Sequence, residues 1–152
     1  MTATCLRQAD RRDIEGMHRV RLAVRENRLA STLGDDDYVY AIETTGRGWV
    51  VEVMGSIVGF AVANARTGNI WALFVDPRHE RCGFGRRLHD TMLRWLFATG
   101  ADRAWLSTQP GTRAARFYEA AGWRSIGMSD NRELQLELRR ETFEVNANAV
   151  RT

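Results

Sequence analysis

The sequence VDPRHERCGFGRR at residues 75–87 constrains the fold of this chain more than any other segment. It follows an apolar run at residues 70–75 and precedes apolar residues at helical spacing, so it predicts a strand, a glycine-rich loop and a helix. The N–H groups of such a loop and of the helix N-terminus favour an anion. Four arginines add positive charge to this segment: Arg78, Arg81, Arg86 and Arg87. The first inference is a site for a phosphate-bearing ligand.

Two common nucleotide-binding motifs do not fit this loop. The dinucleotide motif needs a third glycine where this sequence has Leu88, and the phosphate loop of nucleotide hydrolases needs a lysine. The chain contains no lysine at all. On this segment alone, a tight strand-to-helix turn without a ligand remains the alternative.

Length and composition predict one soluble domain. A chain of 152 residues buries roughly 68–70% of its unfolded surface. Its apolar share of 44% and charged share of 27% are typical of globular proteins. Apolar runs fall short of the roughly 20 residues that a membrane helix needs, and charge appears early in the N-terminal segment. We therefore expect a cytoplasmic protein that has no membrane partner.

Charge and metal-ligand spacing exclude two further classes. The net charge is +3, but the basic residues between Arg7 and Arg28 alternate with acids, and no aromatic residues interleave with them in the way that favours stacking on bases. We expect no nucleic-acid partner. Two cysteines and three histidines show no ligand spacing, so we expect neither a disulfide framework nor a metal site: Cys5, Cys82, His18, His79 and His89.

Periodicity and turn signals predict an alternation of strands and helices. The expected strands are residues 4–7, 49–54, 57–63, 70–75, 104–108, 123–128 and 133–138, with a hairpin turn at Gly55-Ser56. The expected helices are residues 12–28 capped by Asp10, 38–42 capped by Asp37, 85–99, and 112–122. This order predicts an α+β fold with a mixed sheet, antiparallel at first, and helices on both faces. The step from residue 70 to residue 108 implies a right-handed parallel crossover. We assign residues 1–140 to one domain and residues 141–152 to a polar, frayed tail.

A second segment, GTRAARFYEAAGW at residues 111–123, changes the interpretation of the loop. The two segments together resemble the GCN5-related N-acetyltransferase (GNAT) superfamily, whose motifs are V-x-P-x-x-[QR]-x-x-G-x-[GA] and A-x-x-[FY]-Y-x-x-x-G-[FW]. The matching residues are Val75, Pro77, Gly83 and Gly85 in the first motif and Ala114, Phe117, Tyr118, Gly122 and Trp123 in the second. The order of elements is similar over nearly the whole chain. One position departs, because Glu80 stands where the family has Gln or Arg.

The resemblance implies a GNAT-like fold, with a mainly antiparallel central sheet and a splayed parallel pair, and acetyl-CoA as the cosubstrate. The pyrophosphate is then expected at the loop, and the pantetheine arm along the backbone of the preceding strand. The cofactor-binding residues are then expected to be Leu73, Phe74, Val75, Arg81, Cys82, Gly83, Phe84, Gly85 and Arg86. A backbone N–H near Leu73 or Phe74 would polarise the acetyl carbonyl. Glu80 is expected to turn outward or pair with an arginine, and Arg78 or Arg81 to supply the positive contact.

Tyr118 is the candidate general acid. A thiolate of pKa about 8.5 leaves when an amine attacks the thioester, and a phenol of pKa about 10 can hydrogen-bond or protonate that sulfur. The alternative for Tyr118 is a core aromatic on a helix face. The strand at residues 70–75 carries no acid, so the general base has to come from elsewhere. Glu26 is weakly favoured, with Glu52 and residues 35–37 as other candidates, and a plain surface charge is the alternative for each.

The combined expectation is a direct transfer of acetyl from acetyl-CoA to a primary amine of a small molecule or protein, in a ternary complex. Acceptor choice is assigned to the helix–loop–helix from about Val24 to Ile42, where three consecutive aspartates favour a cationic acceptor. A non-catalytic CoA-binding regulatory module is the alternative function. A homodimer is compatible with the exposed aromatic content.

Overall fold

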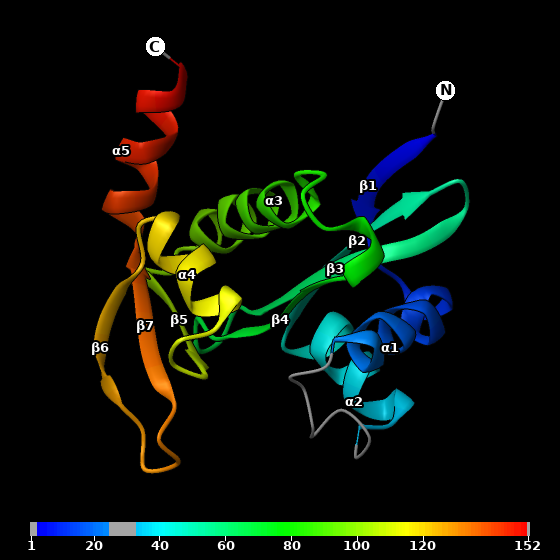
Figure 1. Ribbon diagram of the computed structural model, residues 1–152, viewed down its shortest axis with the longest axis horizontal. Helices are drawn as coiled ribbons and strands as arrows, with labels where there is room; N and C mark the ends of the chain where they lie inside the picture. Colours follow the sequence, from blue (N-terminus) through cyan, green and yellow to red (C-terminus); the bar gives the residue numbers. More distant parts are fainter. Residues whose placement is uncertain (1–2, 25–32, 152) are drawn as a thin grey trace. The chain divides into compact units, whose positions relative to one another are not determined.

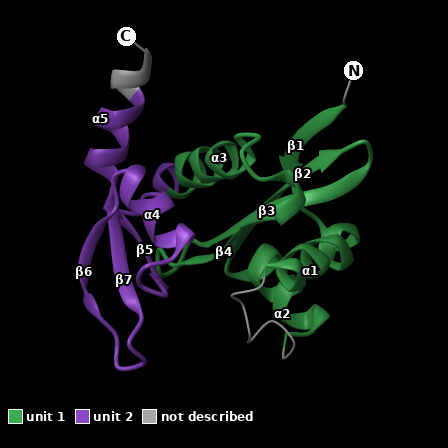
Figure 2. Cartoon of the chain, viewed as in Figure 1, with its two compact units in different colours: residues 1–96 green, residues 97–152 purple. Residues whose placement is uncertain are grey.

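The computed structural model describes residues 3–24 and 33–151. It divides into two compact units, Met1–Leu96 and Phe97–Thr152 (Figure 2). Each unit has its own sheet, with strand order β1-β2-β3-β4 in the first and β5-β7-β6 in the second (Figure 1). Every recorded strand pair is antiparallel. The strands predicted as a parallel pair, β4 and β5, belong to different sheets, and each is an edge strand of its own.

The sheet of the first unit consists of β1 (Thr4–Gln8), β2 (Gly46–Val53), β3 (Ser56–Asn64) and β4 (Ile70–Val75). The pairing of Val53 with Ser56 places the β2–β3 turn at Met54 and Gly55, whose φ angles are 52° and 84°. Two positive φ angles are typical of a type I′ turn, whose twist matches that of the strands. The predicted turn at Gly55-Ser56 was therefore wrong by one residue.

A bulge lies at the start of β4. Val62 pairs with Ala72, and Ala63 pairs with Ile70, which leaves Trp71 as an extra residue in β4. A bulge of this kind bends the strand and redirects the side chain of the extra residue. The Trp71 ring accordingly contacts Tyr38, with ring centroids 5.2 Å apart.

The first helix begins with a 3₁₀ turn, η1 (Arg11–Asp13), and continues as α1 (Ile14–Ala23). Asp10 caps it as predicted, because its carboxylate accepts from the N–H of Arg12 at 2.9 Å. The Asp13 carboxylate in turn accepts a hydrogen bond from the N–H of Asp10 at 2.8 Å, which completes a capping box. The last residues of the predicted helix, 25–28, lie outside the described part of the chain.

The next helix is α2 (Asp35–Val39), which continues as the π-helical turn η3 (Tyr40–Thr44). Gly34 occupies the N-cap position that we had assigned to Asp37. Asp37 lies one turn inside the helix, and its carboxylate accepts from the N–H of Gly34 at 2.8 Å. The prediction was wrong because an acid at the third helical position can bond back to the cap as well as occupy it.

Helices cover both faces of the first sheet, as predicted (Figure 1). On one face, α1, α2 and η3 pack against alternate residues of the strands. The core between them includes Met17, Tyr38 and Ile42 of the helices and Phe60 and Val62 of β3. On the other face lies α3 (Phe84–Ala98), whose Trp95 packs against Trp49 with ring centroids 5.5 Å apart. The helix buries one continuous stripe at helical spacing: Leu88, Met92, Leu93 and Leu96.

The second unit consists of β5 (Arg103–Thr108), α4 (Arg113–Ala120), β6 (Arg124–Met128), β7 (Leu134–Arg139) and α5 (Arg140–Arg151). The Thr112 hydroxyl caps α4 by accepting from the N–H of Ala115 at 3.2 Å. The predicted frayed tail is instead the helix α5. Its Phe143 packs against Phe97, with ring centroids 5.5 Å apart, and the helix also contacts β7.

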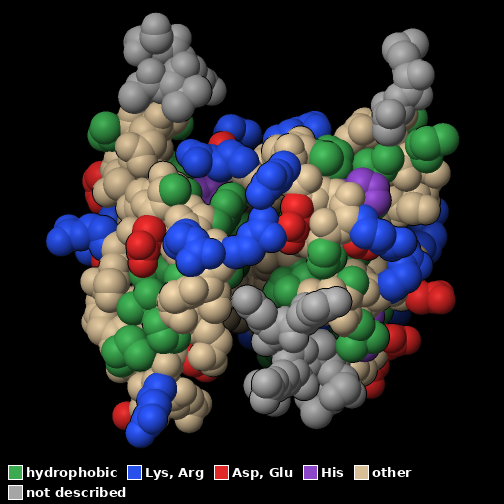
Figure 3. Space-filling model, viewed as in Figure 1, with side chains coloured by type: hydrophobic (Ala, Val, Ile, Leu, Met, Phe, Trp, Pro, Cys, Tyr) green, Lys and Arg blue, Asp and Glu red, His purple; other side chains and the backbone are tan. Residues whose placement is uncertain are grey.

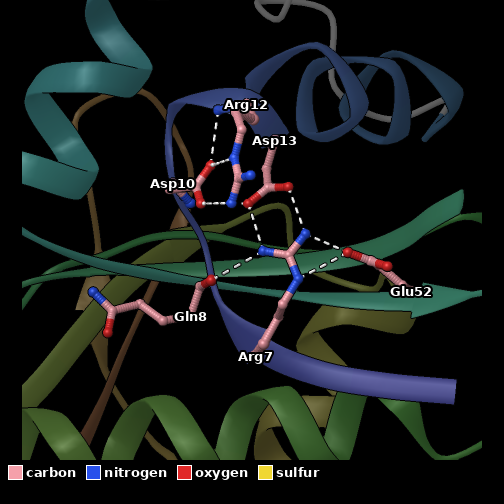
Figure 4. Close-up of polar contacts among 6 residues, drawn as sticks. All are labelled: Arg7, Gln8, Asp10, Arg12, Asp13 and Glu52. Atoms are coloured by element: carbon pink, nitrogen blue, oxygen red, sulfur yellow. Dashed lines mark hydrogen bonds and ion pairs between the residues drawn. The ribbon is translucent and has the colours of Figure 1, made fainter. Parts of the chain in front are cut away.

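A charged network joins β1, η1 and β2 (Figure 4). Arg7 donates to both carboxylate oxygens of Asp13, at 2.9 and 2.7 Å, and also pairs with Glu52. The bond to Asp13 is the main reason why the pKa of Arg7 lies above its ordinary value. The Asp13 side chain is only 5% exposed, so water does not replace these bonds if they are removed.

We predict that Asp13→Ala lowers the free energy of unfolding by about 2 kcal/mol, because it removes two charge-assisted bonds and leaves the Asp10 N–H without its acceptor. Urea denaturation measures this. The matched control is Glu43→Ala, which breaks the exposed pair with Arg11 and changes stability by less than about 0.5 kcal/mol. Equal effects of the two substitutions would contradict the assignment.

Candidate functional site

The open edge of β4 is the first component of the site. The Asp76 N–H donates to the Val58 carbonyl at 2.8 Å, so the backbone of residue 76 faces β3. Backbone direction alternates along a strand, and the regular pairing of residues 72–75 continues that alternation. Phe74 therefore directs its N–H toward β3, whereas Leu73 and Val75 direct theirs toward the edge where β4 has no partner in its sheet.

This alternation separates the predicted cofactor-binding residues of the strand into those whose backbone faces the open edge and one whose backbone faces β3. Leu73 and Val75 present backbone N–H and C=O groups to a ligand lying along the edge. The Phe74 N–H is directed at β3 and not at such a ligand, so Leu73 is the residue of this pair whose N–H faces the edge. The Phe74 side chain instead packs against Phe60, with ring centroids 5.7 Å apart.

The loop after β4 is ordered by Asp76. This buried carboxylate accepts from the N–H of Arg78 at 2.9 Å and caps the turn η4 (Pro77–His79). It also pairs with the Arg78 guanidinium at 3.0 Å, and hydrogen bonding to that guanidinium is the first cause of the lowered pKa of Asp76. Arg78 thus has a structural partner, which makes Arg81 the better candidate for the positive contact.

The second component of the site is the N-terminus of α3. Arg87 donates its N–H to the Gly83 carbonyl at 3.1 Å, so Gly83 is the last residue before the helix. The N–H groups of Phe84, Gly85 and Arg86 then have no acceptor within the helix. Together with the helix dipole they form an anion cradle at the end of the open β4 edge. Gly83 has φ +81°, a backbone conformation that side chains disfavour.

Arginine charge surrounds this cradle. Arg86 pairs with Asp90 at 3.2 Å, while Arg81 and Arg87 are exposed and form no recorded ion pair with the described residues. Arginines are also prominent on the face drawn in Figure 3. Glu80 is exposed, so its carboxylate stays in contact with water and carries no desolvation penalty. Cys82 is exposed too, and its thiol donates to the Glu80 carbonyl at 3.6 Å.

Tyr118, the predicted general acid, lies on α4 in the second unit. It is 7% exposed and packs against Phe117 and Trp123, with ring centroids 5.3 and 5.2 Å away. Burial raises the pKa of Tyr118 above its ordinary value, so the phenol stays protonated throughout the neutral range. A group of this kind can donate a hydrogen bond to a developing anion.

The sequence of residues 22–123, more than half of the chain, matches the acetyltransferase (GNAT) family. The chain belongs to this family. Its members are acetyltransferases that use acetyl-CoA, and the assignment confirms both the predicted resemblance and the α+β fold class.

Similar proteins agree with the GNAT assignment. A mycothiol acetyltransferase from Beutenbergia cavernae is 32% identical over 108 residues, which is 70% of this chain and 34% of that protein. The chain therefore spans about a third of that relative. Ard1 from Thermoplasma volcanium is similar in structure, with a TM-score of 0.74, 24% identity and coverage of 90% of this chain and 97% of the other. PaiA N-acetyltransferase from Thermoplasma acidophilum, solved with coenzyme A, has a TM-score of 0.71, 11% identity and coverage of 90% and 99%.

Among the described residues, the candidate general bases have different surroundings, and only Asp37 shares a pocket with a residue of β4, Trp71. Glu52 is held by Arg7 in the network of Figure 4. Asp35, Asp36 and Asp37 are exposed on the first turn of α2, and Asp37 is bonded to a backbone N–H. Glu26, the favoured candidate, lies outside the described residues.

Sequence reasoning missed Arg21 as a site residue. It is 4% exposed on α1, and its guanidinium lies 4.3 Å from the Trp71 ring centroid, beside β4. The signal was present, because Arg21 follows Ile14 and Met17 at helical spacing and is the one charged residue in that apolar stripe.

In residues 3–24 and 33–151, no group of three or more His, Cys, Asp or Glu side chains is arranged to hold a metal ion. Over the same ranges, none of the helices has the length and apolar character required to cross a bilayer.

We predict that Gly83→Ala weakens coenzyme A binding at least tenfold, because the added methyl group opposes the positive φ that aims the cradle. Isothermal titration calorimetry measures the affinity. Gly55→Ala is a matched control, because Gly55 has φ +84° and equally open surroundings but lies in the β2–β3 turn. Normal affinity of the Gly83 variant would place the ligand elsewhere.

Proposed function

We propose that this chain is an acetyl-CoA-dependent N-acetyltransferase that transfers acetyl directly to a primary amine. The observation that carries this proposal is the open backbone edge of β4, which leads through an arginine-rich loop into the N-terminus of α3. Membership of the GNAT family supports it.

In this proposal the two components bind different parts of the cosubstrate. The pyrophosphate accepts hydrogen bonds from the N–H groups of Phe84, Gly85 and Arg86, and Arg81 and Arg87 neutralise its charge. The amides of the pantetheine arm pair with the backbone of Leu73 and Val75, as an added strand would. A ligand that satisfies an open strand edge gains bonds that no side chain has to supply.

The same edge assists the reaction. The Leu73 N–H points away from β3, so it can donate to the acetyl carbonyl, whose oxygen gains negative charge when the amine attacks. The nitrogen must be neutral to attack. An α-amine of pKa about 7.7–8.0 meets this need near pH 8 without a strong base, whereas a lysine side chain at about 10.4 does not.

Tyr118 acts on the leaving group in this proposal. The thiolate has a pKa near 8.5, and the buried phenol has a pKa above its usual value of about 10, so full proton transfer from the phenol is uphill. Tyr118 therefore stabilises the sulfur mainly by donating a hydrogen bond as the C–S bond breaks.

We predict that Tyr118→Phe lowers kcat at least tenfold while coenzyme A affinity stays within twofold, because the ring still packs and only the donor is lost. Steady-state thiol release and calorimetry measure the two quantities. Ser125→Ala, which removes an exposed hydroxyl from β6 in the same unit, is the control and leaves both unchanged. Unchanged turnover in the Tyr118 variant would remove it from the mechanism.

The alternative, a non-catalytic CoA-binding regulatory module, differs in one measurement. Both functions predict a thermal shift on adding coenzyme A. Only the enzyme releases thiol when a panel of amines is added to the acetyl-CoA complex. Binding without turnover on any acceptor would favour the module. Cytoplasmic localisation and a homodimer remain predictions, which fractionation and light scattering measure.

A further inference from the structure

Arg21 occupies an unusual environment in the first unit. Its guanidinium is surrounded by four aromatic rings, with centroids 4.3 to 5.6 Å from its central carbon: Trp71, Phe74, Tyr38 and Phe60. Burial lowers the pKa of Arg21 from its usual value, but a guanidinium remains charged at neutral pH. The residue is thus a buried cation.

The hydrogen-bonding capacity of Arg21 is largely unused. A guanidinium has five N–H donors. Nη2 donates to the Trp71 carbonyl over a long 3.4 Å, and the buried Nε has no partner. Among the described residues, no carboxylate forms an ion pair with Arg21. The Tyr38 hydroxyl accepts a further hydrogen bond from Arg21 and also lies 2.7 Å from Nδ1 of His18.

Such an arrangement favours an anionic ligand. Cation–π contacts offset part of the desolvation of a buried charge, but they do not satisfy N–H donors. A carboxylate fits a guanidinium better than any other common anion in amine metabolites, because both groups are planar and pair through two parallel bonds. Arg21 is desolvated when the protein folds. Binding of a carboxylate therefore does not include the free-energy cost of desolvating the guanidinium.

The position of Arg21 connects it to the transfer reaction. Its contact with β4 is the carbonyl of Trp71, the extra residue of the bulge. Leu73, whose N–H faces the open edge, follows Trp71 by two residues in β4, so the carboxylate-binding group and the carbonyl-binding group contact the same short stretch of strand. This arrangement suits a small molecule that carries an amine and a carboxylate. Trp71 also lines a pocket of about 200 Å³ with Leu33, Asp37, Tyr40 and Val62, which offers room for a side chain.

We propose that Arg21 binds the carboxylate of the acceptor, and that the acceptor is therefore a small amino carboxylic acid. This proposal rests on the proposed acetyltransferase function and specifies its substrate class. It differs from the cationic acceptor favoured by the aspartates of residues 35–37, which are exposed at the start of α2. A purely structural role for Arg21, as a cation packed among aromatic rings, is the competing explanation.

The test compares matched acceptors on matched enzymes. A panel of L-amino acids is assayed beside the corresponding carboxamides, whose α-amines are less basic, so each kcat/KM is expressed per neutral amine at the assay pH. The ratio of these values for acid to amide is measured for the wild type, Arg21→Gln and Arg19→Gln. Arg19 is an exposed arginine two residues away on the same helix. Because each ratio is taken on one enzyme, a general loss of activity or stability cancels.

We expect the wild type to prefer acids at least tenfold, Arg19→Gln to keep that preference, and Arg21→Gln to reduce the ratio at least tenfold. A structural role predicts that Arg21→Gln lowers the activity on acids and amides equally, which would overturn the proposal. If Arg21→Gln fails to fold, the wild type alone still tests the proposal. Equal values of kcat/KM for acids and amides on the wild type would exclude carboxylate recognition.

Calorimetry on the coenzyme A complex separates this proposal from the proposed function. Acetylation of carboxamides as fast as acids would keep the acetyltransferase and reject the role of Arg21. Tighter binding of acids than amides by the wild type and Arg19→Gln but not by Arg21→Gln, without turnover on any amine, would keep the carboxylate site and reject the enzyme. Absence of any preference in binding would reject the site.

Discussion

The bond from the Asp76 N–H to the Val58 carbonyl, together with the regular pairing of residues 72–75, fixes which way the backbone groups of that part of β4 face. With that register set, Leu73 and Val75 present their N–H and C=O groups along an edge that has no strand partner within its sheet. An open edge is normally a liability, because it invites pairing with other chains. Here it leads directly into the loop and the first turn of α3, so the same unsatisfied groups that make the edge costly make it suited to an elongated ligand.

Asp76 has two roles at this junction. Its backbone ends the pairing with β3, and its buried side chain caps the turn that starts the loop. Because Arg78 is bound to that carboxylate, the positive charge nearest β4 is used for structure, and Arg81 and Arg87 are the arginines available to a phosphate. Glu80, the departure from the family motif, is tolerated because it is exposed. A short loop can thus carry an acidic residue and still favour an anion at the helix N-terminus.

Arg21 illustrates a different balance. Burial among aromatic rings removes water from the Arg21 guanidinium. Among the described residues, no carboxylate forms an ion pair with it. The bulge at Trp71 makes this possible, because the extra residue turns a large ring and a carbonyl toward α1.

The sequence by itself determined β4, the glycine-rich loop, α3 and the α4 segment with Tyr118, because apolar periodicity, glycines and caps act over a few neighbouring residues. It also indicated the family and the cosubstrate, since two motifs stood at the right separation. It misplaced the β2–β3 turn by one residue, assigned the α2 cap to Asp37 and treated α5 as frayed. The tertiary structure alone decided that Leu73 rather than Phe74 faces the open edge, that Glu52 is held by Arg7, and that Arg21 is buried. Register, bulges and ion pairs between distant segments depend on contacts that no local pattern encodes.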